Sequence, residues 1–568
     1  MKSDQLEAGH LKTLLWLGLL TLLPYVNVLQ NGFVWDDKTF IIDNYPIRHP
    51  LLLFTISLKS ISIGYRPLML LSLALDYSIW GLNPAGFHLT NLLLHALNVL
   101  LVYFLALRVT RGGLWAPLAG LLFALHPVHS EAVAAMLGRS DLLVTAFSLV
   151  CLLMYYGFLF HSRPSLKRVF YFGALLSYAA ACLTKETGII FPLLIVICEN
   201  LAWKDNVRRR GFWAQVVTLV PFLAMGLLYL WFRQVTAPTI GQQAWGSGGW
   251  QTGLLMMTVL WKYLVLLVFP FFLSPYYLPY WPEGWDYLQV LGGLFVLLGS
   301  VALLLRYHRR IPLLAWAIAW LGISLLPVSN IIPIPGAMMN ERWLYFPSVG
   351  LVILLGWGAS KILSRAQLAL KKVLWGVGVT LLLLFAVRIV SWNAVWRSDE
   401  SVALKILQQH PESSLAHNNL GNYLFCVGRL REAKQEYAQA LLLDPEGARS
   451  HANLGNVYCA EQNWPRGIAE YRKALALDPR LAPAWYALGV AYQRQGVLDS
   501  ALTQYQRVLQ LDPLHVPALK GSGGILLEKK EYGLAEDYFR RALAIAPQDP
   551  ELKSSLARTH ELRSGQVR

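Results

Sequence analysis

Five prolines stand in register in the last third of this 568-residue chain, each 34 residues from the next. They occupy positions 411, 445, 479, 513 and 547. A fixed period of this length is typical of stacked helical hairpins, because each hairpin buries its apolar face only against its neighbours. The period therefore predicts an α-solenoid for the C-terminal part of the chain.

Further positions repeat with the same step and fit the tetratricopeptide pattern. A Leu-Gly or Ser-Gly pair marks the first helix of each unit, a small residue lies where two helices approach, and an aromatic residue fills the space between units. These positions are 420–421, 454–455, 488–489 and 522–523, then Ala433, Gly467, Ala501 and Ala535, then Tyr437, Tyr471, Tyr505 and Phe539. We predict a linker and capping half-repeat over 392–413, four repeats over 414–549, and a cap helix and tail over 550–568.

Residues 1–391 are apolar runs separated by short polar turns, and the whole chain is 55% hydrophobic and only 14% charged. A soluble domain has about 25% charged residues, and a helix needs about 20 apolar residues to cross the hydrocarbon core. The sequence therefore predicts an all-α chain, with a polytopic transmembrane helix bundle before the solenoid. The eleven predicted spans are 11–29, 88–107, 114–130, 141–160, 169–184, 187–203, 213–232, 287–305, 312–328, 342–362 and 373–390.

Basic residues at the span ends predict the orientation of the bundle. If the apolar stretch 254–273 does not cross, every basic cluster falls on one side, which is then the cytoplasmic side. We therefore expect 254–273 to be interfacial or re-entrant, the N-terminus to be cytoplasmic and the repeats to be extracytoplasmic. The membrane would be the inner membrane of a bacterium or the endoplasmic reticulum of a eukaryote. The clusters are Lys2 and Lys12, Arg108 and Arg111, 161–168, 204–210, 306–310 and 361–372.

The remaining composition excludes little else. The net charge of +16 is explained by these cytoplasmic clusters, so nucleic acid is not an expected partner. The five cysteines form no CxxC or zinc spacing, and the pairing of Cys426 with Cys459 stays open. No small-residue cleavage site follows 11–29, so this span is expected to be a retained anchor.

Polar side chains gather at the predicted outer ends of the spans, where an ionisable group is costly unless it has a role. An acidic pair, Asp36 and Asp37, lies in the first outer loop. Histidines, carboxylates and cations recur at the later outer ends. They are Arg66, His88, His126, His129, Glu131, Arg139, Asp141, Lys185, Glu186, Glu341 and Arg342. Ordinary polar loops could give the same pattern, but the concentration at span ends favours a site.

Six of these stretches, together with the order of the two halves, resemble the transmembrane and tetratricopeptide-repeat O-mannosyltransferases. This family is similar to the protein O-mannosyltransferases of the GT-C class. The resemblance implies a multispan bundle with an acidic pair in its first outer loop, and transfer of a sugar from a polyprenyl phosphate to serine or threonine hydroxyls. The animal members of this family carry more repeats than the four to five expected here, so the resemblance is to a prokaryotic relative. The stretches are Phe33-Val34-Trp35-Asp36-Asp37, Tyr65-Arg66-Pro67-Leu68, His126-Pro127-Val128-His129-Ser130-Glu131, Gly138-Arg139-Ser140-Asp141, Leu183-Thr184-Lys185-Glu186 and Glu341-Arg342-Trp343-Leu344-Tyr345-Phe346-Pro347-Ser348.

The residue types fit that chemistry. A hydroxyl acceptor needs a base, for which Asp36 and Asp37 are equal candidates. A phosphate leaving group needs cations, for which we expect Arg66, Arg139, Lys185 and Arg342. We expect His88, His126, His129, Asp141, Glu186 and Glu341 to bind substrate. Direct attack predicts inversion at the anomeric carbon, although Glu131 could serve as the covalent nucleophile of a double displacement.

Three further expectations complete this interpretation. His126 and His129 with Glu131 could hold a divalent cation, but hydrogen bonding within the bundle is commoner, so no metal or other cofactor is expected. The repeat groove is expected to recruit the acceptor protein. The alternatives are a non-enzymatic membrane scaffold, which would need only one span, and a transporter, which would place paired charges near mid-membrane.

Overall fold

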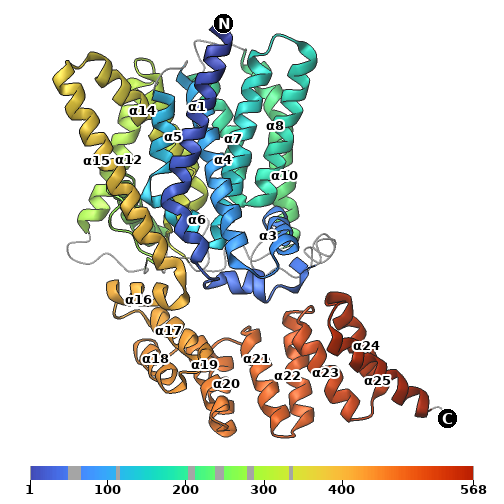
Figure 1. Cartoon of the computed structure of the whole chain (residues 1–568). Helices are drawn as coiled ribbons and strands as arrows, with labels where there is room; N and C mark the ends of the chain where they lie inside the picture. The colour runs from blue at the N-terminus through green and yellow to red at the C-terminus, as the bar shows by residue number, and fades with distance from the viewer. Residues whose placement is uncertain are drawn as a thin grey trace. The chain divides into compact units, whose positions relative to one another are not determined.

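The computed structural model describes residues 2–48, 66–110, 115–202, 211–236, 249–277, 287–331 and 337–566, and every regular element in these ranges is a helix (Figure 1). The predicted all-α class is therefore confirmed. Tyr65, Arg111 and the basic cluster 204–210 lie outside the described residues. The chain forms two compact units, Met1–Phe40 with Ile63–Ser398 and Ile41–Ser62 with Asp399–Arg568, called here the membrane unit and the repeat unit.

The membrane unit contains long apolar helices joined by short turns. Among the residues that the structure describes, eight helical stretches are long and apolar enough to cross a membrane, so the protein is a multi-pass membrane protein. The count of eleven spans stays a prediction. The helices are α1 (Lys2–Leu22), α3 (Pro67–Trp80), α4 (Pro84–Thr110), α5 (Trp115–Ala124), α6 (Ser130–Ala134), α7 (Arg139–Phe160), α8 (Pro164–Thr184), α9 (Phe191–Ile197), α10 (Phe212–Thr236), α11 (Gly249–Val268), α12 (Tyr287–Tyr307), α13 (Pro312–Leu325), α14 (Ser348–Arg365) and α15 (Leu368–Asn393).

Short helices follow or precede several of these, and they carry most of the candidate residues. The predicted span 114–130 ends early: α5 stops at Ala124, and Pro127 opens a new turn because it cannot continue the helix before it. The short helices are η1 (Leu23–Gln30), η2 (Lys38–Ile42), η3 (Tyr45–Arg48), η4 (Pro127–His129), η5 (Met136–Gly138), η6 (Glu186–Ile190), η7 (Cys198–Ala202), η9 (Leu326–Val328), η10 (Glu341–Leu344) and η11 (Ala394–Arg397).

The stretch that we expected to be interfacial forms one helix, α11, which by length and composition could cross a membrane. It packs beside α12, where Trp261 and Met257 lie against Gly292 and Gly293. The Met256 sulfur also lies 3.6 Å from Nδ2 of Asn330, beyond α13, and the Leu267 carbonyl oxygen lies 3.1 Å from Nε2 of His126, beyond α5. The interfacial position of this stretch stays a prediction.

The first and last helices of the membrane unit are joined by amide side chains. Asn31 donates from Nδ2 to the Asn393 carbonyl oxygen at 3.0 Å, and Asn393 donates to the Pro24 carbonyl oxygen at 3.2 Å. Just beyond, the Gly32 N–H donates to the Arg397 carbonyl oxygen at 3.0 Å. The helical bundle is thus closed where η1 and η11 meet. Because η11 continues to Arg397, this compact unit extends to Ser398. The domain boundary at residue 391 stays a prediction.

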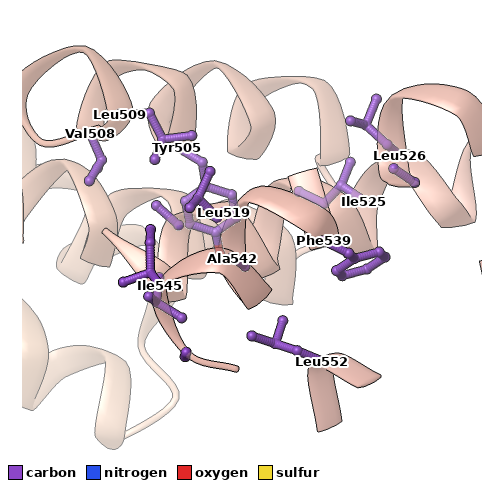
Figure 2. Close-up of a cluster of buried hydrophobic side chains, with 14 of the residues drawn as sticks. Tyr505, Val508, Leu509, Leu519, Ile525, Leu526, Phe539, Ala542, Ile545 and Leu552 are labelled. Atoms are coloured by element: carbon purple, nitrogen blue, oxygen red, sulfur yellow. The ribbon is translucent and has the colours of Figure 1, made fainter. Parts of the chain in front are cut away.

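The repeat unit is built from helix pairs stacked in chain order (Figure 1). Each pair begins within a residue of its predicted start, and the buried side chains between the last pairs include Tyr505, Phe539 and Leu552 (Figure 2). The helices are α16 (Asp399–Gln409), α17 (Ser414–Cys426), α18 (Leu430–Leu443), α19 (Ala448–Ala460), α20 (Trp464–Leu477), α21 (Ala482–Arg494), α22 (Leu498–Leu511), α23 (Val516–Glu528), α24 (Tyr532–Ile545) and α25 (Pro550–Gln566).

In each of the four repeats, a glycine of the first helix packs against the aromatic ring of the second helix, which explains why these two positions keep a constant spacing. A Cβ placed on Gly455 would lie 2.7 Å from the ring of Tyr471, which packs directly on the glycine. Gly421, Gly489 and Gly523 have the same relation to the aromatic residue of their own repeat. Only glycine leaves room for this ring, so the Gly and aromatic positions must recur together. Cys426 and Cys459 are both free thiols.

Candidate active site

The two carboxylates of the acidic pair in the first loop differ in burial. Asp36 is exposed, whereas Asp37 is 2% exposed and its Oδ2 accepts a hydrogen bond from the Val34 N–H at 3.0 Å. The backbone of Met136 and Leu137, in η5, also bonds the Asp37 carboxylate. Burial nevertheless raises the pKa of Asp37 to about 7. A carboxyl group with a pKa near neutrality is suited to take a proton from a hydroxyl.

Four of the predicted residues form one chain of charges at the ends of α6, α7, α8 and η10. Lys185 Nζ lies 2.5 Å from Asp141 Oδ1, and Arg342 Nε lies 3.9 Å from Asp141 Oδ2. Arg342 also reaches Glu131, through its guanidinium at 3.6 Å and its backbone N–H at 2.9 Å. Asp141, Lys185 and Glu131 are buried, while the Arg342 side chain is 22% exposed. The sequence placed these residues at separate span ends, and the fold brings them together.

A second ion pair lies beside this chain. Arg66 donates to Glu186 through Nη2 at 2.8 Å and through Nε at 3.3 Å, which is the bidentate geometry that arginine favours with carboxylates. Both side chains remain about a quarter exposed. Burial opposes ionisation of Glu186, but Arg66 and then Arg233 hold the pKa of its carboxyl below the usual range. Arg233, near the end of α10, is a cation that the sequence analysis did not select.

In both clusters burial disfavours the charged forms, and the opposite charges nearby reduce that effect. Burial lowers the pKa of Lys185, and Asp141 opposes that shift. Burial likewise raises the pKa of Glu131, and Arg342 opposes it. Arg66 and Arg342 are both close enough to the Lys185 ammonium group to lower its pKa further. An anionic ligand such as a phosphate would therefore meet three cations, Arg66, Lys185 and Arg342. Their present partners are carboxylates, which such a ligand could displace.

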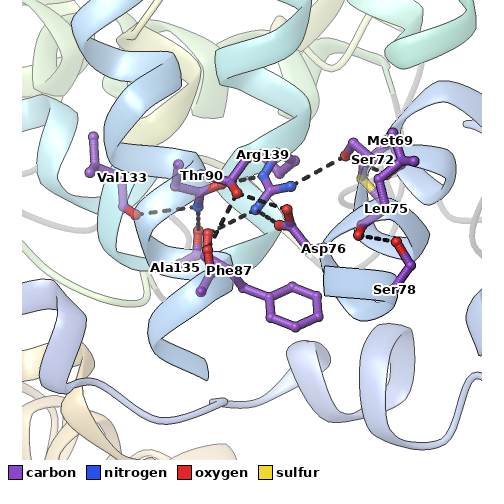
Figure 3. A network of polar contacts seen from close by, with 12 residues as sticks. Met69, Ser72, Leu75, Asp76, Ser78, Phe87, Thr90, Val133, Ala135 and Arg139 are labelled. Carbon is purple, nitrogen blue, oxygen red and sulfur yellow. Dashed lines mark hydrogen bonds and ion pairs between the residues drawn. The ribbon is translucent and has the colours of Figure 1, made fainter. Parts of the chain in front are cut away.

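Arg139 has a different environment from the other predicted phosphate ligands (Figure 3). Its side chain is fully buried, and Nη2 donates to Asp76 Oδ2 at 2.7 Å and to the Phe87 carbonyl oxygen at 2.8 Å. Its Nε donates to Oδ1 of Asn91, and Nη1 lies 3.4 Å from Ser72 Oγ. Each guanidinium nitrogen already has a protein partner, so the geometry favours a positioning role over phosphate binding.

This network fixes the turn that holds Asp37. Asn91 donates from Nδ2 to the carbonyl oxygens of Val133 and Ala135, both at 3.3 Å, immediately before η5. Arg139 follows η5 directly. Both sides of the turn are thus tied to α4, and through Asp76 to α3. The sequence analysis missed Asp76 because α3 has no polar periodicity to mark it.

Two of the three predicted histidines are hydrogen-bonded within the bundle, whereas neither ring nitrogen of His88 has a hydrogen-bond partner among the described residues. His126 accepts from the Val128 N–H at 3.3 Å through Nδ1, and its Nε2 faces the Leu267 carbonyl oxygen. His129 lies 2.8 Å from the Phe123 carbonyl oxygen and 2.9 Å from Ser348 Oγ. His88 is fully buried beside the backbone of Asn31 and Gly32.

His126, His129 and Glu131, the residues considered as metal ligands, have partners within the protein, and the absence of a metal stays an expectation. Within the described ranges, no group of three His, Cys, Asp or Glu side chains is arranged to hold a metal ion. The nitrogens of His126 and His129 are taken by protein groups, so the predicted substrate contacts of these two side chains would have to replace existing hydrogen bonds. We infer that the hydrogen bonds of His126 and His129 hold η4, the turn that precedes Glu131, in place.

Glu341 lies next to the ion chain and is completely buried. Its Oε1 accepts from the Ser274 N–H at 2.6 Å and the Tyr277 hydroxyl at 2.9 Å, and its Oε2 accepts from Trp392 Nε1 at 3.2 Å. Burial, and then the nearby Glu131, raise the pKa of Glu341 well above its usual range. Glu341 therefore holds the segment after α11 in place, and its predicted substrate contact stays untested.

A small cavity adjoins the ion chain. Its volume is about 20 Å³, and Asp141, Ser148, Thr187 and Ser324 contribute its polar lining. Oδ2 of Asp141 and Oγ of Ser324 are buried with no hydrogen-bond partner among the described residues. A cavity needs about 10–15 Å³ to hold a water molecule, so this one has room for a single water and is too small for a sugar.

Comparison with known proteins connects this geometry to a family. Models described as the TPR or tetratricopeptide repeat match residues 414–446, 455–496 and 486–550, which confirms the predicted repeats. Among solved structures, MamA is 23% identical and has a TM-score of 0.24, covering 26% of this chain and 88% of MamA. TTC0263, a thermophilic TPR protein in Thermus thermophilus, is 19% identical with a TM-score of 0.26, covering 30% and 94%. Such scores carry no structural argument.

Curated relatives match a larger part of the chain. Human protein O-mannosyl-transferase TMTC4 is 28% identical over 74% of this chain and 65% of the human protein. Human protein O-mannosyl-transferase TMTC1 is 30% identical over 74% and 54%, and protein O-mannosyl-transferase F38B6.6 of Caenorhabditis elegans is 26% identical over 76% and 63%. The chain thus spans less than two thirds of these relatives. A match over 74% of the chain is longer than either unit and extends into both, so these transmembrane and tetratricopeptide-repeat protein O-mannosyl-transferases are homologues of this chain in its membrane unit and in its repeat unit.

Proposed function

We propose that the protein transfers a sugar, mannose by analogy with its relatives' names, from a polyprenyl-phosphate donor to serine or threonine hydroxyls of extracytoplasmic proteins. The site is the group of charges described above, with Asp37 in the adjoining loop. The repeat unit recruits the acceptor protein. The single observation that carries the proposal is the concentration of Arg66, Lys185 and Arg342 at one end of the bundle.

Each group has a distinct part in the proposed reaction. Asp37 removes the proton from the acceptor hydroxyl, and that oxygen forms a bond to the anomeric carbon. The bond from this carbon to the phosphate oxygen breaks, and the electron pair stays on the leaving polyprenyl phosphate. Arg66, Lys185 and Arg342 stabilise the charge that grows on the phosphate, because they are already fixed in a largely buried site.

This arrangement favours inversion at the anomeric carbon. A double displacement would need Glu131 as a free nucleophile. Both oxygens of Glu131 instead face Arg342, at 3.6 Å and 2.9 Å. Inversion therefore remains the proposed outcome, and a product with retained configuration would contradict it.

The proposal also requires the site and the start of the repeats to lie on the same side of the membrane, and one hydrogen bond supports this. The bond from Gly32 to Arg397 places the exit of the chain from this unit next to the loop of Asp36 and Asp37. The repeats would then begin on the face where the site opens, which we propose to be the extracytoplasmic face. Cysteine accessibility tagging at Lys38 and at Arg431 tests this, and tags that react from opposite sides would refute it.

The decisive experiment uses the full-length protein in liposomes with polyprenyl-phosphate mannose and a serine- and threonine-containing peptide. Wild type should transfer mannose, and the double variant D36N/D37N should not. D478N is the matched control, because Asp478 is in the repeat unit and an asparagine there keeps the acceptor that bonds the Arg480 N–H. A non-enzymatic scaffold, the alternative from the sequence, would show no transfer in wild type and normal partner binding in D36N/D37N.

A further inference from the structure

Two buried tyrosine hydroxyls lie beside the two ion clusters of the candidate site. They belong to Tyr229 of α10 and Tyr263 of α11, which are 6% and 3% exposed. Neither hydroxyl has a hydrogen-bond partner among the described residues. A buried hydroxyl of this kind has given up its hydrogen bonds to water and has gained none in the protein, so its presence needs an explanation.

Tyr229 lies on the side of α10 that meets the cluster of Glu186. The helix α10 packs beside α8, whose end leads into η6 (Figure 1). Three residues before Tyr229, a Cβ on Gly226 would lie 3.5 Å from Cγ1 of Ile189 in η6. Four residues after Tyr229, Arg233 is close enough to lower the pKa of Glu186. Residues three and four apart share one face of a helix, so the Tyr229 side chain lies on the face turned to η6.

Tyr263 lies beside the other cluster. It packs in one group of buried side chains with Val128 of η4 and Trp343 of η10, the turns that precede Glu131 and contain Arg342. Glu131 is also one of the charged groups near enough to act on the Tyr263 hydroxyl. The hydroxyls of α10 and α11 thus accompany one ion cluster each.

An unpartnered hydroxyl alone would not indicate a ligand. The hydroxyl of Tyr178 in α8 is also buried with no partner among the described residues, but the groups that act on it are the thiols of Cys182 and Cys151. Tyr229 and Tyr263 differ because charged groups surround them. The carboxylates of the two clusters are paired with cations, and neither hydroxyl bonds them. Both hydroxyls are therefore available to an anion that enters among the cations.

We propose that Tyr229 and Tyr263 bind the phosphate of the lipid-linked donor, an inference that rests on the proposed function. A tyrosine O–H donates to a phosphate oxygen without adding a charge to the site. The cations must release their carboxylates to bind phosphate, whereas these two hydroxyls have no bond to break. A hydrogen bond to an ionised group is stronger than one between neutral groups, which favours the phosphate over a sugar hydroxyl as their partner.

The test removes the two hydroxyls and keeps the rings. The double variant Y229F/Y263F loses no hydrogen bond within the protein, so its thermal unfolding should occur at or above the wild-type temperature. Tyr171→Phe is the matched control, because the Tyr171 hydroxyl donates to the Thr218 carbonyl oxygen at 2.8 Å. Tyr171→Phe should unfold at a lower temperature and bind ligand like wild type. A lower unfolding temperature of Y229F/Y263F would show that its hydroxyls have partners in the protein, and would overturn the proposal.

Binding is measured with full-length protein in detergent and farnesyl phosphate, a short polyprenyl phosphate without sugar. Tyr229→Phe and Tyr263→Phe should each bind it about 10-fold more weakly than wild type, and Y229F/Y263F about 100-fold more weakly. Farnesol, which lacks the phosphate, should bind wild type and Y229F/Y263F equally. Equal affinities of wild type and Y229F/Y263F for farnesyl phosphate, or no binding by wild type, would overturn the proposal. A defect seen only with farnesyl-phosphate mannose would assign the hydroxyls to the sugar, and would overturn it as well.

A transfer assay separates this inference from the proposed function. With farnesyl-phosphate mannose as donor, Y229F/Y263F should raise KM for the donor and leave KM for the acceptor peptide unaltered, a split that general damage to the fold would not produce. If wild type transfers mannose but the variant binds farnesyl phosphate normally, the two tyrosines are wrongly assigned and the enzymatic function stands. If wild type binds farnesyl phosphate more tightly than the variant but transfers nothing, the assignment stands and the enzymatic function is wrong.

Discussion

Replacing Arg139 by methionine should destabilise the membrane unit strongly. Arg139 is fully buried, and its loss leaves Asp76 as an unpaired buried carboxylate and removes the donor to the Phe87 carbonyl oxygen. Breaking a buried ion pair by removing one partner costs about 3–5 kcal/mol. The double variant D76L/R139M removes both charges, and leaves only neutral acceptors such as Asn91 Oδ1 and Phe87 O without their donor, at about 1–3 kcal/mol. It should therefore be more stable than R139M by about 2 kcal/mol.

Thermal unfolding of the detergent-solubilised protein measures these differences, and a transfer assay below the transition measures activity. Equal melting of R139M and wild type would refute the ion-pair argument, as would a double variant no more stable than R139M. Activity decides between the two roles of Arg139. If it positions the Asp37 turn, D76L/R139M regains activity together with stability. A loss of more than about 100-fold in a folded double variant would instead support phosphate binding, as the sequence suggested.

Three further predictions follow from single residues. Asp37→Asn should lower kcat/KM by about 100-fold or more, while Asp36→Asn retains most activity. Because burial raises the pKa of Asp37 from 3.8 to about 7, transfer by the wild type should fall as the pH drops through 7. The stability that the protonated Asp37 contributes below pH 3.8 should be lost as the pH rises through 7, and melting curves of Asp37→Asn should lack this dependence. Lys185→Met should reduce kcat by about 100-fold or more with polyprenyl-phosphate mannose, and an unchanged kcat would remove Lys185 from the site. Gly455→Ala should lower the free energy of unfolding of the repeat unit by about 1–3 kcal/mol, because its Cβ would lie 2.7 Å from the Tyr471 ring, and chemical denaturation with unchanged stability would show that the ring moves freely.

The repeat unit could be predicted closely because its information is local and periodic. Each proline, each Gly-aromatic pair and each small residue recurs at 34-residue steps. The register of one repeat therefore fixes the next, and no long-range contact has to be known. What the sequence did not reveal is the hydrogen bonding between repeats, such as Asn453 to Asn418, since that depends on which rotamers the packing allows.

The candidate site was predictable only as a list of residue types. Apolar runs show where helices end, and so which charged groups share one end of the bundle. They do not show which charges meet: Lys185 pairs with Asp141, 44 residues away, and Arg342 with Glu131, 211 residues away. They also give no signal for Asp76, which lies within an apolar stretch and is the partner of a predicted ligand.

The closure between η1 and η11 has a mechanical consequence. Arg397 lies just before the start of the repeat unit, and its carbonyl oxygen accepts a hydrogen bond from the Gly32 N–H. Asp37 follows Gly32 by five residues. A displacement of the chain at Arg397 would therefore reach the loop of the proposed base through one hydrogen bond and five residues.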